Sequence, residues 1–178
     1  MKAWTTFIQS LHLRQDHEVT ANYELLDQQL EGLIGGEDDL LAATANFVGL
    51  LHAEIPDINW LGIYVKRGDE LVLGPFQGLP ACVHIPMGHG VCGTAASELH
   101  TIRVGNVHEF DGHIACDPDS RSEIVVPLIS QGAVFAVLDI DSPHEDRFSA
   151  DDQAGVEKLC DRFVQRLIAI KPDLQNFI

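Results

Sequence analysis

Two pairs of alternating apolar segments constrain the fold of this chain more than any other feature. In each pair, a short glycine-containing turn separates two apolar runs: residues 59–65 and 70–76 flank Arg67-Gly68-Asp69, and residues 123–129 and 133–140 flank Gln131-Gly132. Short apolar runs joined by such turns are typical of β-hairpins. The sequence therefore predicts two antiparallel hairpins.

Helical patterns surround these hairpins. Apolar residues at helical spacing predict helices over 18–33, from Asp38 or Asp39 to the residue before Pro56, and over 150–170 behind Ser149. Between the hairpins we expect a short helix over 90–99, a short strand over 101–104 and a polar loop over 105–121. Mostly antiparallel strands flanked by helices indicate an α+β fold. A doubly wound parallel sheet is disfavoured because strands do not alternate strictly with long helices.

Length and charge restrict the domain organisation and the partners. The 178 residues are typical of one domain, predicted here over 18–172, between an N-terminal arm (1–17) and a C-terminal tail (173–178). The net charge of −16 argues against nucleic acid or an anionic membrane as the partner. No run of 18 apolar residues and no secretory signal is evident, so we expect a cytoplasmic protein with reduced cysteines.

The stretch GHGVCG, residues 88–93, matches the G-x-G-x-x-G pattern of dinucleotide-binding turns. Such a turn opens a βαβ series, whereas this stretch lies mid-chain before a short helix. We therefore interpret its glycines as a tight turn into a helix, with N–H groups near Cys92 and near any bound anion. That position at a helix N-terminus also favours a low pKa for the Cys92 thiol.

The four cysteines fall into two groups. Cys82, Cys92 and Cys116 lie in the loop-rich middle, whereas Cys160 lies beside apolar residues of the last helix and is predicted to be a core residue. A zinc site built from the first three and a histidine lacks the close C-x-x-C or H-x-x-x-H pairs of structural zinc sites. Spacing alone is equally compatible with thiol redox chemistry and with three semi-buried cysteines.

Three acidic residues are candidates for a site. Asp139 and Asp141 alternate with apolar neighbours and therefore share one face of a strand. In the domain interior they would need a cation or a proton, and the alternative is an exposed strand end. Glu123 opens a strand seven positions after Cys116. Burial would raise its pKa and make it a general acid, whereas exposure would leave it an ordinary surface carboxylate.

Six segments of the chain, taken together, resemble one protein family. They are DINWLGIYV (57–65), LVLGPFQG (71–78), ACVHIPMGHGVCGTA (81–95), DGHIACD (111–117), SEIVVPL (122–128) and VLDIDS (137–142). In this order and density they are similar to segments of the free methionine-(R)-sulfoxide reductases, small enzymes built on a GAF domain. The resemblance covers about residues 20–170.

The resemblance implies an antiparallel sheet of about six strands with helices on both faces and a small closed cavity. It implies reduction of the R epimer of free, not peptide-bound, methionine sulfoxide, with thioredoxin as the reductant and no bound cofactor or metal. It leaves the oligomeric state open, with a homodimer as the candidate. The alternatives are a GAF-type sensor of a small ligand with redox-sensitive cysteines, and a metal-binding protein.

The resemblance also implies roles for individual residues. Cys116 is the expected nucleophile, Cys82 the resolving thiol and Cys92 an auxiliary thiol, an order that the residues alone do not fix. Glu123 is the expected proton donor to the sulfoxide oxygen, a role that Asp141 could share. Asp139 and Asp141 are expected to bind the substrate ammonium, and N–H groups of the GHGVCG turn its carboxylate. Trp60 and Tyr64, four apart on one strand face, would contact the S-methyl group, although two core aromatics would show the same spacing.

Overall fold

The computed structural model describes residues 21–112 and 117–175. Its elements follow the chain in the order α2 (Tyr23–Ile34), α3 (Leu40–Glu54), β1 (Trp60–Arg67), β2 (Glu70–Gln77), β3 (His84–Pro86), α4 (Gly90–Glu98), β4 (Ile102–Val104), the 3-10 turn η1 (Val107–Glu109), β5 (Ser122–Ser130), β6 (Ala133–Ser142) and α5 (Ala150–Ile170). Both predicted hairpins are present as β1–β2 and β5–β6, which pair antiparallel.

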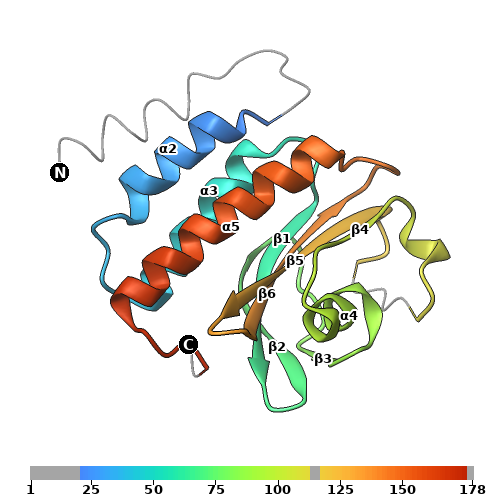
Figure 1. The fold of residues 1–178 in the computed structure, drawn as a ribbon. Coiled ribbons are helices and arrows are strands. Elements are labelled where there is room, and N and C mark those ends of the chain that lie inside the picture. Colours follow the sequence, from blue (N-terminus) through green and yellow to red (C-terminus); the bar gives the residue numbers. More distant parts are fainter. Residues whose placement is uncertain (1–20, 113–116, 176–178) are drawn as a thin grey trace.

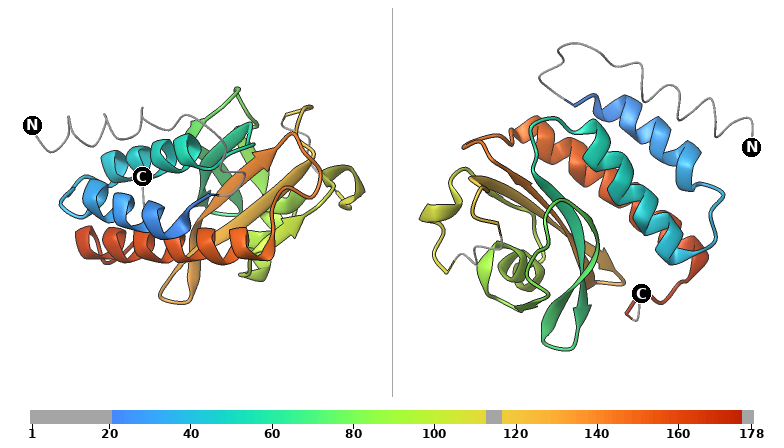
Figure 2. Two further views of the ribbon diagram at one scale, coloured as in Figure 1. Left: turned by 90° about the horizontal axis from the view of Figure 1, so that it is seen from above. Right: turned by 180° about the vertical axis from the view of Figure 1, so that it is seen from behind.

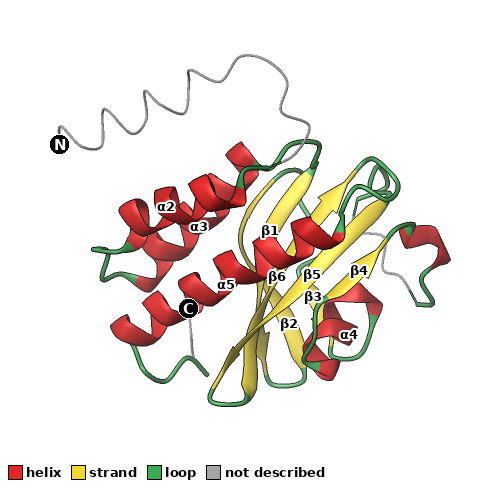
Figure 3. Ribbon diagram, turned by 45° about the horizontal axis from the view of Figure 1, so that its top comes forward, coloured by secondary structure: helices red, strands yellow, loops and turns green. Residues whose placement is uncertain are grey.

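The strands form one six-stranded sheet in the order β3-β2-β1-β6-β5-β4, and each neighbouring pair is antiparallel. Helices α2, α3 and α5 lie together on one side of the sheet, and α4 lies on the other (Figures 1 and 2). Figure 3 shows α4 beside the short strand β3, away from the three-helix layer. The predicted α+β fold with about six antiparallel strands and helices on both faces is confirmed.

Most predicted boundaries agree with the structure to within a few residues. Asp39 is the N-cap of α3 and Ser149 the N-cap of α5, and each side chain accepts a hydrogen bond from a backbone N–H of the first turn. Helix α2 begins at Tyr23, after the N-cap Asn22, rather than at residue 18. The predicted loop over 105–121 contains η1. The predicted arm 1–17 and residues 176–178 of the predicted tail lie outside the described residues.

Strand alternation divides the interior into two apolar clusters. On β1, Leu61, Ile63 and Val65 point into the larger cluster beneath α2, α3 and α5. Trp60 and Tyr64 point the other way, into a smaller cluster beneath α4. The larger cluster supplies most of the apolar burial that stabilises the domain, at roughly 1.5–3 kcal/mol for each large side chain. The smaller cluster lies beside buried polar groups, as expected for a functional site.

Among the described residues, no helix has both the length and the apolar character needed to cross a bilayer.

Candidate active site

A small cavity lies between α4 and the face of the sheet that carries Tyr64. Its volume is about 30 Å³, enough for one or two water molecules. Its lining includes four carboxyl groups and a thiol and, among the described residues, no basic side chain: Tyr64, Ile85, Gly90, Val91, Cys92, Asp117, Ser120, Glu123, Asp139 and Asp141.

Strand register brings the acids together. Asp141 of β6 lies opposite Trp60 of β1 on one side and opposite Glu123 of β5 on the other. Asp139 lies one row further along, opposite Gly62 and Val125. Asp139 and Glu123 are each only 6% exposed and Asp141 is half-buried, so the acids do not form the exposed strand end that the alternative interpretation required. The predicted shared face is thus a buried face.

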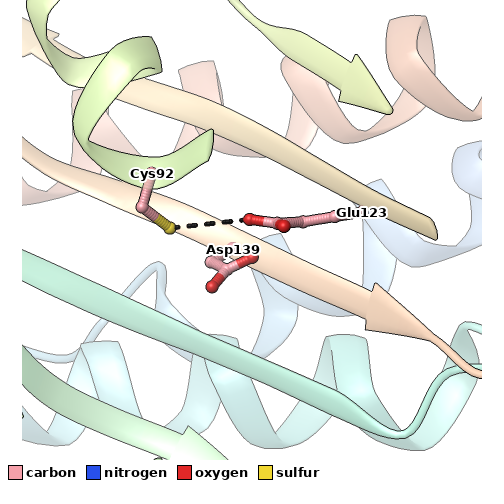
Figure 4. Close-up of side chains that lie close together, drawn as sticks. All are labelled: Cys92, Glu123 and Asp139. Atoms are coloured by element: carbon pink, nitrogen blue, oxygen red, sulfur yellow. Dashed lines mark hydrogen bonds between the residues drawn. The ribbon is translucent and has the colours of Figure 1, made fainter. Parts of the chain in front are cut away.

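Cys92 completes this cluster from the other side of the cavity. Its thiol donates to Glu123 Oε1 at 3.9 Å, and Figure 4 shows Asp139 pointing toward the same region from the neighbouring strand. One ligand-type atom from each of the three side chains lies within 4.8 Å of the other two. Asp139 Oδ1 is buried and has no hydrogen-bond partner among the described residues.

Burial and the repulsion between neighbouring negative charges raise the pKa values of the carboxyl groups in this cluster. Burial raises the pKa of Asp139 to about 6. Burial also raises the pKa of Glu123 well above its usual value, and the negative charges of Asp139 and Asp141 raise it further. Burial also raises the pKa of Asp141, and the negative charges of Asp139 and Asp117 raise it further. The cavity therefore favours the protonated form of its carboxyl groups, or a bound cation, over several buried negative charges.

The prediction of a low pKa for Cys92 is wrong. Cys92 is the third residue of α4, as predicted, but its sulfur faces the carboxyl groups. Burial raises the pKa of the thiol, and the charges of Asp139 and Glu123 raise it further. The favourable helix dipole is outweighed because desolvation and two nearby anions act on the sulfur at shorter range.

We expect Asp139→Asn to stabilise the protein at neutral and alkaline pH. With a folded-state pKa of about 6 against an ordinary 3.8, the folded state binds more protons than the unfolded chain between these values. Stability therefore falls as pH rises through that window, by on the order of 3 kcal/mol, and stays lower above it. Thermal unfolding of both proteins at about pH 8 and about pH 4 tests this. A gain from the substitution that is as large at the lower pH would contradict the proposed cause.

Two aromatic side chains form the wall beneath the acids. Tyr64 lines the cavity and donates its hydroxyl hydrogen bond to the Cys82 carbonyl at 3.0 Å. Trp60 stacks between Tyr64 and Phe76, and its indole N–H donates to the Leu79 carbonyl at 3.0 Å. The Trp60 indole is not among the residues that line the cavity. Trp60 therefore contacts Tyr64 and the loop after β2 and does not contact the cavity itself.

A glycine on β1 makes room for that indole. A Cβ built on Gly62 would lie 2.3 Å from the Trp60 ring and 2.7 Å from Phe76 Cβ. Such contacts force neighbouring groups to move, so any side chain here would displace the aromatic wall. Gly62 lies between Trp60 and Tyr64 on the same face of β1. A glycine is needed there because the side chains of Trp60 and Phe76 leave no room for a third side chain.

The GHGVCG turn leads into α4, as predicted, and both Gly88 and Gly90 have positive φ. The hydrogen bonds of α4 begin with Gly93, whose N–H donates to the carbonyl of His89. The N–H groups of residues 90–92 belong to the first helical turn, which lacks internal acceptors, and these residues line the cavity. The turn thus presents an anion-binding helix end to the site.

Every described strand pair is antiparallel, which excludes the dinucleotide interpretation for the described sheet.

The structure distinguishes the cysteines. Cys82, on the loop between β2 and β3, is disulfide-bonded. Cys92 and Cys160 carry free thiols, and Cys160 is buried in the larger apolar cluster, as predicted. Cys116 lies outside the described residues, so its predicted role is not tested. The thiol-rich zinc set considered from the sequence does not match the described cluster, which joins one cysteine to two carboxylates.

Three residues with contacts at the site were missed from the sequence. Asn59, just before β1, donates from its amide to Asp117 Oδ2 at 2.9 Å and to Ser120 Oγ at 3.1 Å. Asp117 and Ser120 both line the cavity. Asn59 therefore joins the start of β1 to the segment 117–120, which contributes two residues to the cavity lining. An asparagine before a strand is common, so only the spatial contact identifies it.

We expect Asn59→Ala to lower kcat/KM by up to roughly 30-fold, because the segment 117–120 loses two hydrogen bonds of about 1 kcal/mol each. Steady-state kinetics with the substrate tests this, and Asn106→Ala, which removes an exposed Asn106–Glu145 hydrogen bond at the surface, is the matched control. Equal kinetics in the two variants would show that Asn59 does not position the site.

Comparisons with known proteins find GAF-domain proteins, among them several free methionine-R-sulfoxide reductases. The GAF domain family model matches residues 39–167. The free methionine-R-sulfoxide reductase of Escherichia coli (strain K12) is 49% identical over 140 residues, which cover 79% of this chain and 85% of that protein. The reduced form of fRMsr of Staphylococcus aureus superposes with a TM-score of 0.82 at 46% identity, covering 86% of this chain and 99% of the other.

A free methionine-R-sulfoxide reductase from Neisseria meningitidis, solved in complex with its substrate, superposes with a TM-score of 0.83 at 39% identity. That match covers 89% of this chain and 95% of the other. The sequences and the folds therefore match over nearly the whole domain, including the strands and the helix that build the acidic cavity.

Proposed function

Because the chain belongs to the free methionine-R-sulfoxide reductase family of GAF-domain proteins, we propose that it reduces free methionine-(R)-sulfoxide to methionine. The structural observation that supports this proposal most strongly is the composition of the cavity lining. A buried thiol and four carboxyl groups line the cavity, and its described lining contains no basic residue, so it is suited to a small molecule that carries a positive charge and accepts a proton.

The two ends of a free amino acid match two features of the cavity. The ammonium group would lie against Asp139 and Asp141, where Asp139 Oδ1 has no partner among the described residues. The carboxylate would accept hydrogen bonds from N–H groups at the start of α4. A residue within a peptide has neither charge, so this arrangement supports specificity for the free amino acid.

The S-methyl group would face Tyr64, which lines the cavity and against which Trp60 stacks from behind. Sulfur–aromatic and apolar contacts favour the methyl group there, while the sulfoxide oxygen is directed toward the acids. The R and S epimers exchange the oxygen and the lone pair at sulfur. A site with an apolar wall and an acidic wall therefore discriminates between them.

A cavity of about 30 Å³ is far smaller than the several hundred Å³ of typical small-molecule sites. Substrate binding thus requires the lining to open. Cys82 is disulfide-bonded in this structure, and we propose that reduction of this disulfide precedes substrate entry.

The reaction would proceed in two balanced steps. The Cys116 thiolate attacks the sulfoxide sulfur, and Glu123, aided by Asp141, protonates the oxygen, which is transferred to give Cys116 sulfenic acid and methionine. The Cys82 thiol then condenses with the sulfenic acid, forming a disulfide and releasing water. Thioredoxin, as the external dithiol, reduces this disulfide through a mixed disulfide and is itself oxidised. Cys92 serves as an auxiliary thiol.

A single-turnover experiment tests this function. Fully reduced protein with excess free methionine-(R)-sulfoxide and no reductant is expected to form about one methionine per chain and to lose about two titratable thiols. Added thioredoxin, with its reductase and NADPH, should restore continuous turnover. Binding of the sulfoxide without methionine formation would instead support the GAF-type ligand sensor. The homodimer and the cytoplasmic location stay predictions.

A further inference from the structure

We propose that Cys92, Glu123 and Asp139 form a binding site for a thiophilic divalent cation of the zinc class, and that this cation inhibits the protein. The three side chains come from α4, β5 and β6, so the tertiary structure, not a local motif, assembles the donor set. Figure 4 shows the sulfur and the two carboxyl groups gathered around one small volume.

The distances are close to those of a metal centre. Cys92 Sγ and Glu123 Oε1 are 3.9 Å apart, and no pair of the three donor atoms exceeds 4.8 Å. In a zinc site with metal–ligand lengths of about 2.0–2.3 Å, neighbouring donor atoms lie roughly 3.5 Å apart. The donor atoms would therefore need to move closer together, by about 1.3 Å at most.

An independent observation marks the cluster as incomplete. Asp139 is 6% exposed, and although its carboxyl group hydrogen-bonds with Cys92 and Glu123, its Oδ1 atom has no hydrogen-bond partner among the described residues. Buried carboxylate oxygens in native structures are nearly always paired, so an unpaired one directed into a cavity indicates a missing cation or donor. No described residue of the cavity lining supplies a positive charge.

The donor chemistry selects the ion. Thiolate sulfur disfavours Mg²⁺ and Ca²⁺, whereas one thiolate with two carboxylates is a set that Zn²⁺ accepts. A cavity of about 30 Å³ leaves room for the ion and about one water molecule as the fourth ligand. Binding would displace the protons of Cys92 and the acids, and affinity would therefore increase with pH.

Inhibition follows from the shared residues, and this part of the inference rests on the proposed function. Zinc bound to Asp139 occupies the position assigned to the substrate ammonium. Zinc bound to Glu123 removes the proton donor. The ion and free methionine-(R)-sulfoxide would therefore compete, and zinc would raise the apparent KM.

The disulfide form of the protein allows a selective binding test with Co²⁺ as the spectroscopic probe. In that form Cys92 and Cys160 are the free thiols among the described cysteines. We expect Co²⁺ to give a thiolate-to-cobalt charge-transfer band, which Zn²⁺ displaces at a stoichiometry of about one. The band should vanish in Cys92→Ala and persist in Cys160→Ala, whose side chain lies in the larger apolar cluster. Ions held at the exposed pairs His84–Glu70 and His100–Glu98 would give no such band.

A second variant keeps the proposal open to refutation if Cys92→Ala folds poorly. Glu123→Gln retains the shape of the side chain but removes its charge, and zinc affinity, measured against a chromophoric chelator, should fall at least about tenfold. A cobalt–thiolate band that survives in Cys92→Ala, or zinc affinity unchanged in both variants, would overturn the site. Turnover measured without metal is a separate result. Reductase activity with no zinc binding would refute this inference alone, and zinc binding without activity would refute the proposed function alone.

Discussion

Replacement of the proposed nucleophile, Cys116→Ser, is expected to lower turnover of free methionine-(R)-sulfoxide by at least about 10³-fold. The reaction needs a sulfur atom that attacks the sulfoxide, accepts its oxygen and is later reduced through a disulfide. A serine oxygen can do none of these steps at neutral pH, because it is a weak nucleophile and has no sulfenic acid or disulfide state. The measurement is steady-state kinetics with a thioredoxin system.

Two control variants separate the nucleophile from the other thiols. Cys160→Ala should leave turnover unchanged, because Cys160 is buried away from the cavity in the larger apolar cluster. Cys82→Ser should still form methionine in the first turnover and accumulate a sulfenic acid that a trapping reagent detects. If instead Cys116→Ser retains turnover and Cys82→Ser loses the first turnover, Cys82 is the nucleophile and the proposed order is wrong.

The second large effect is expected for Glu123→Gln, with a loss of about 10²–10⁴-fold in kcat/KM. Glu123 is buried, and burial together with Asp139 and Asp141 raises its pKa. The raised pKa favours the protonated carboxylic acid, the form that can donate a proton to the sulfoxide oxygen. Glutamine keeps the size and the hydrogen-bonding capacity but has no transferable proton.

The pH dependence of Glu123→Gln tests this role more specifically than its rate. A general acid must be protonated, so kcat/KM of the parent should fall as pH rises through the raised pKa of the acidic cluster. That decline should be reduced or absent in the variant, while Glu109→Gln, an exposed carboxylate on η1, should behave like the parent. An unaltered pH profile in Glu123→Gln would assign proton donation to another group, with Asp141 as the first candidate.

The fold could be predicted from the sequence to a large extent, because its main determinants are local and periodic. Alternation in residues 59–76 and 123–140 fixes which side chains share a face, and the turns fix which strands pair. This is why Asp139 and Asp141 could be placed on one face before the structure was known. The caps Asp39 and Ser149 could be identified because capping depends on a few adjacent residues.

What the sequence could not provide depends on contacts between distant elements. The pKa of Cys92 was predicted from its own helix, but the determining groups are Asp139 and Glu123 on two other strands. The burial of Glu123 depends on α4 covering the sheet, and the role of Asn59 depends on a contact with Asp117, 58 positions away. No local pattern encodes these distances. The same reason explains why the cysteine–carboxylate cluster differs from the zinc set of three cysteines and a histidine, which the residue spacing already disfavoured.

The most direct test of the account is the fate of the two epimers of racemic free methionine sulfoxide, followed separately by chiral chromatography during turnover with a thioredoxin system. We expect the R epimer to be consumed, the S epimer to remain, and a peptide-bound R sulfoxide in the same mixture to stay unreduced. Consumption of both free epimers at similar rates, or of neither by a protein whose thiols are fully reduced, would contradict this expectation.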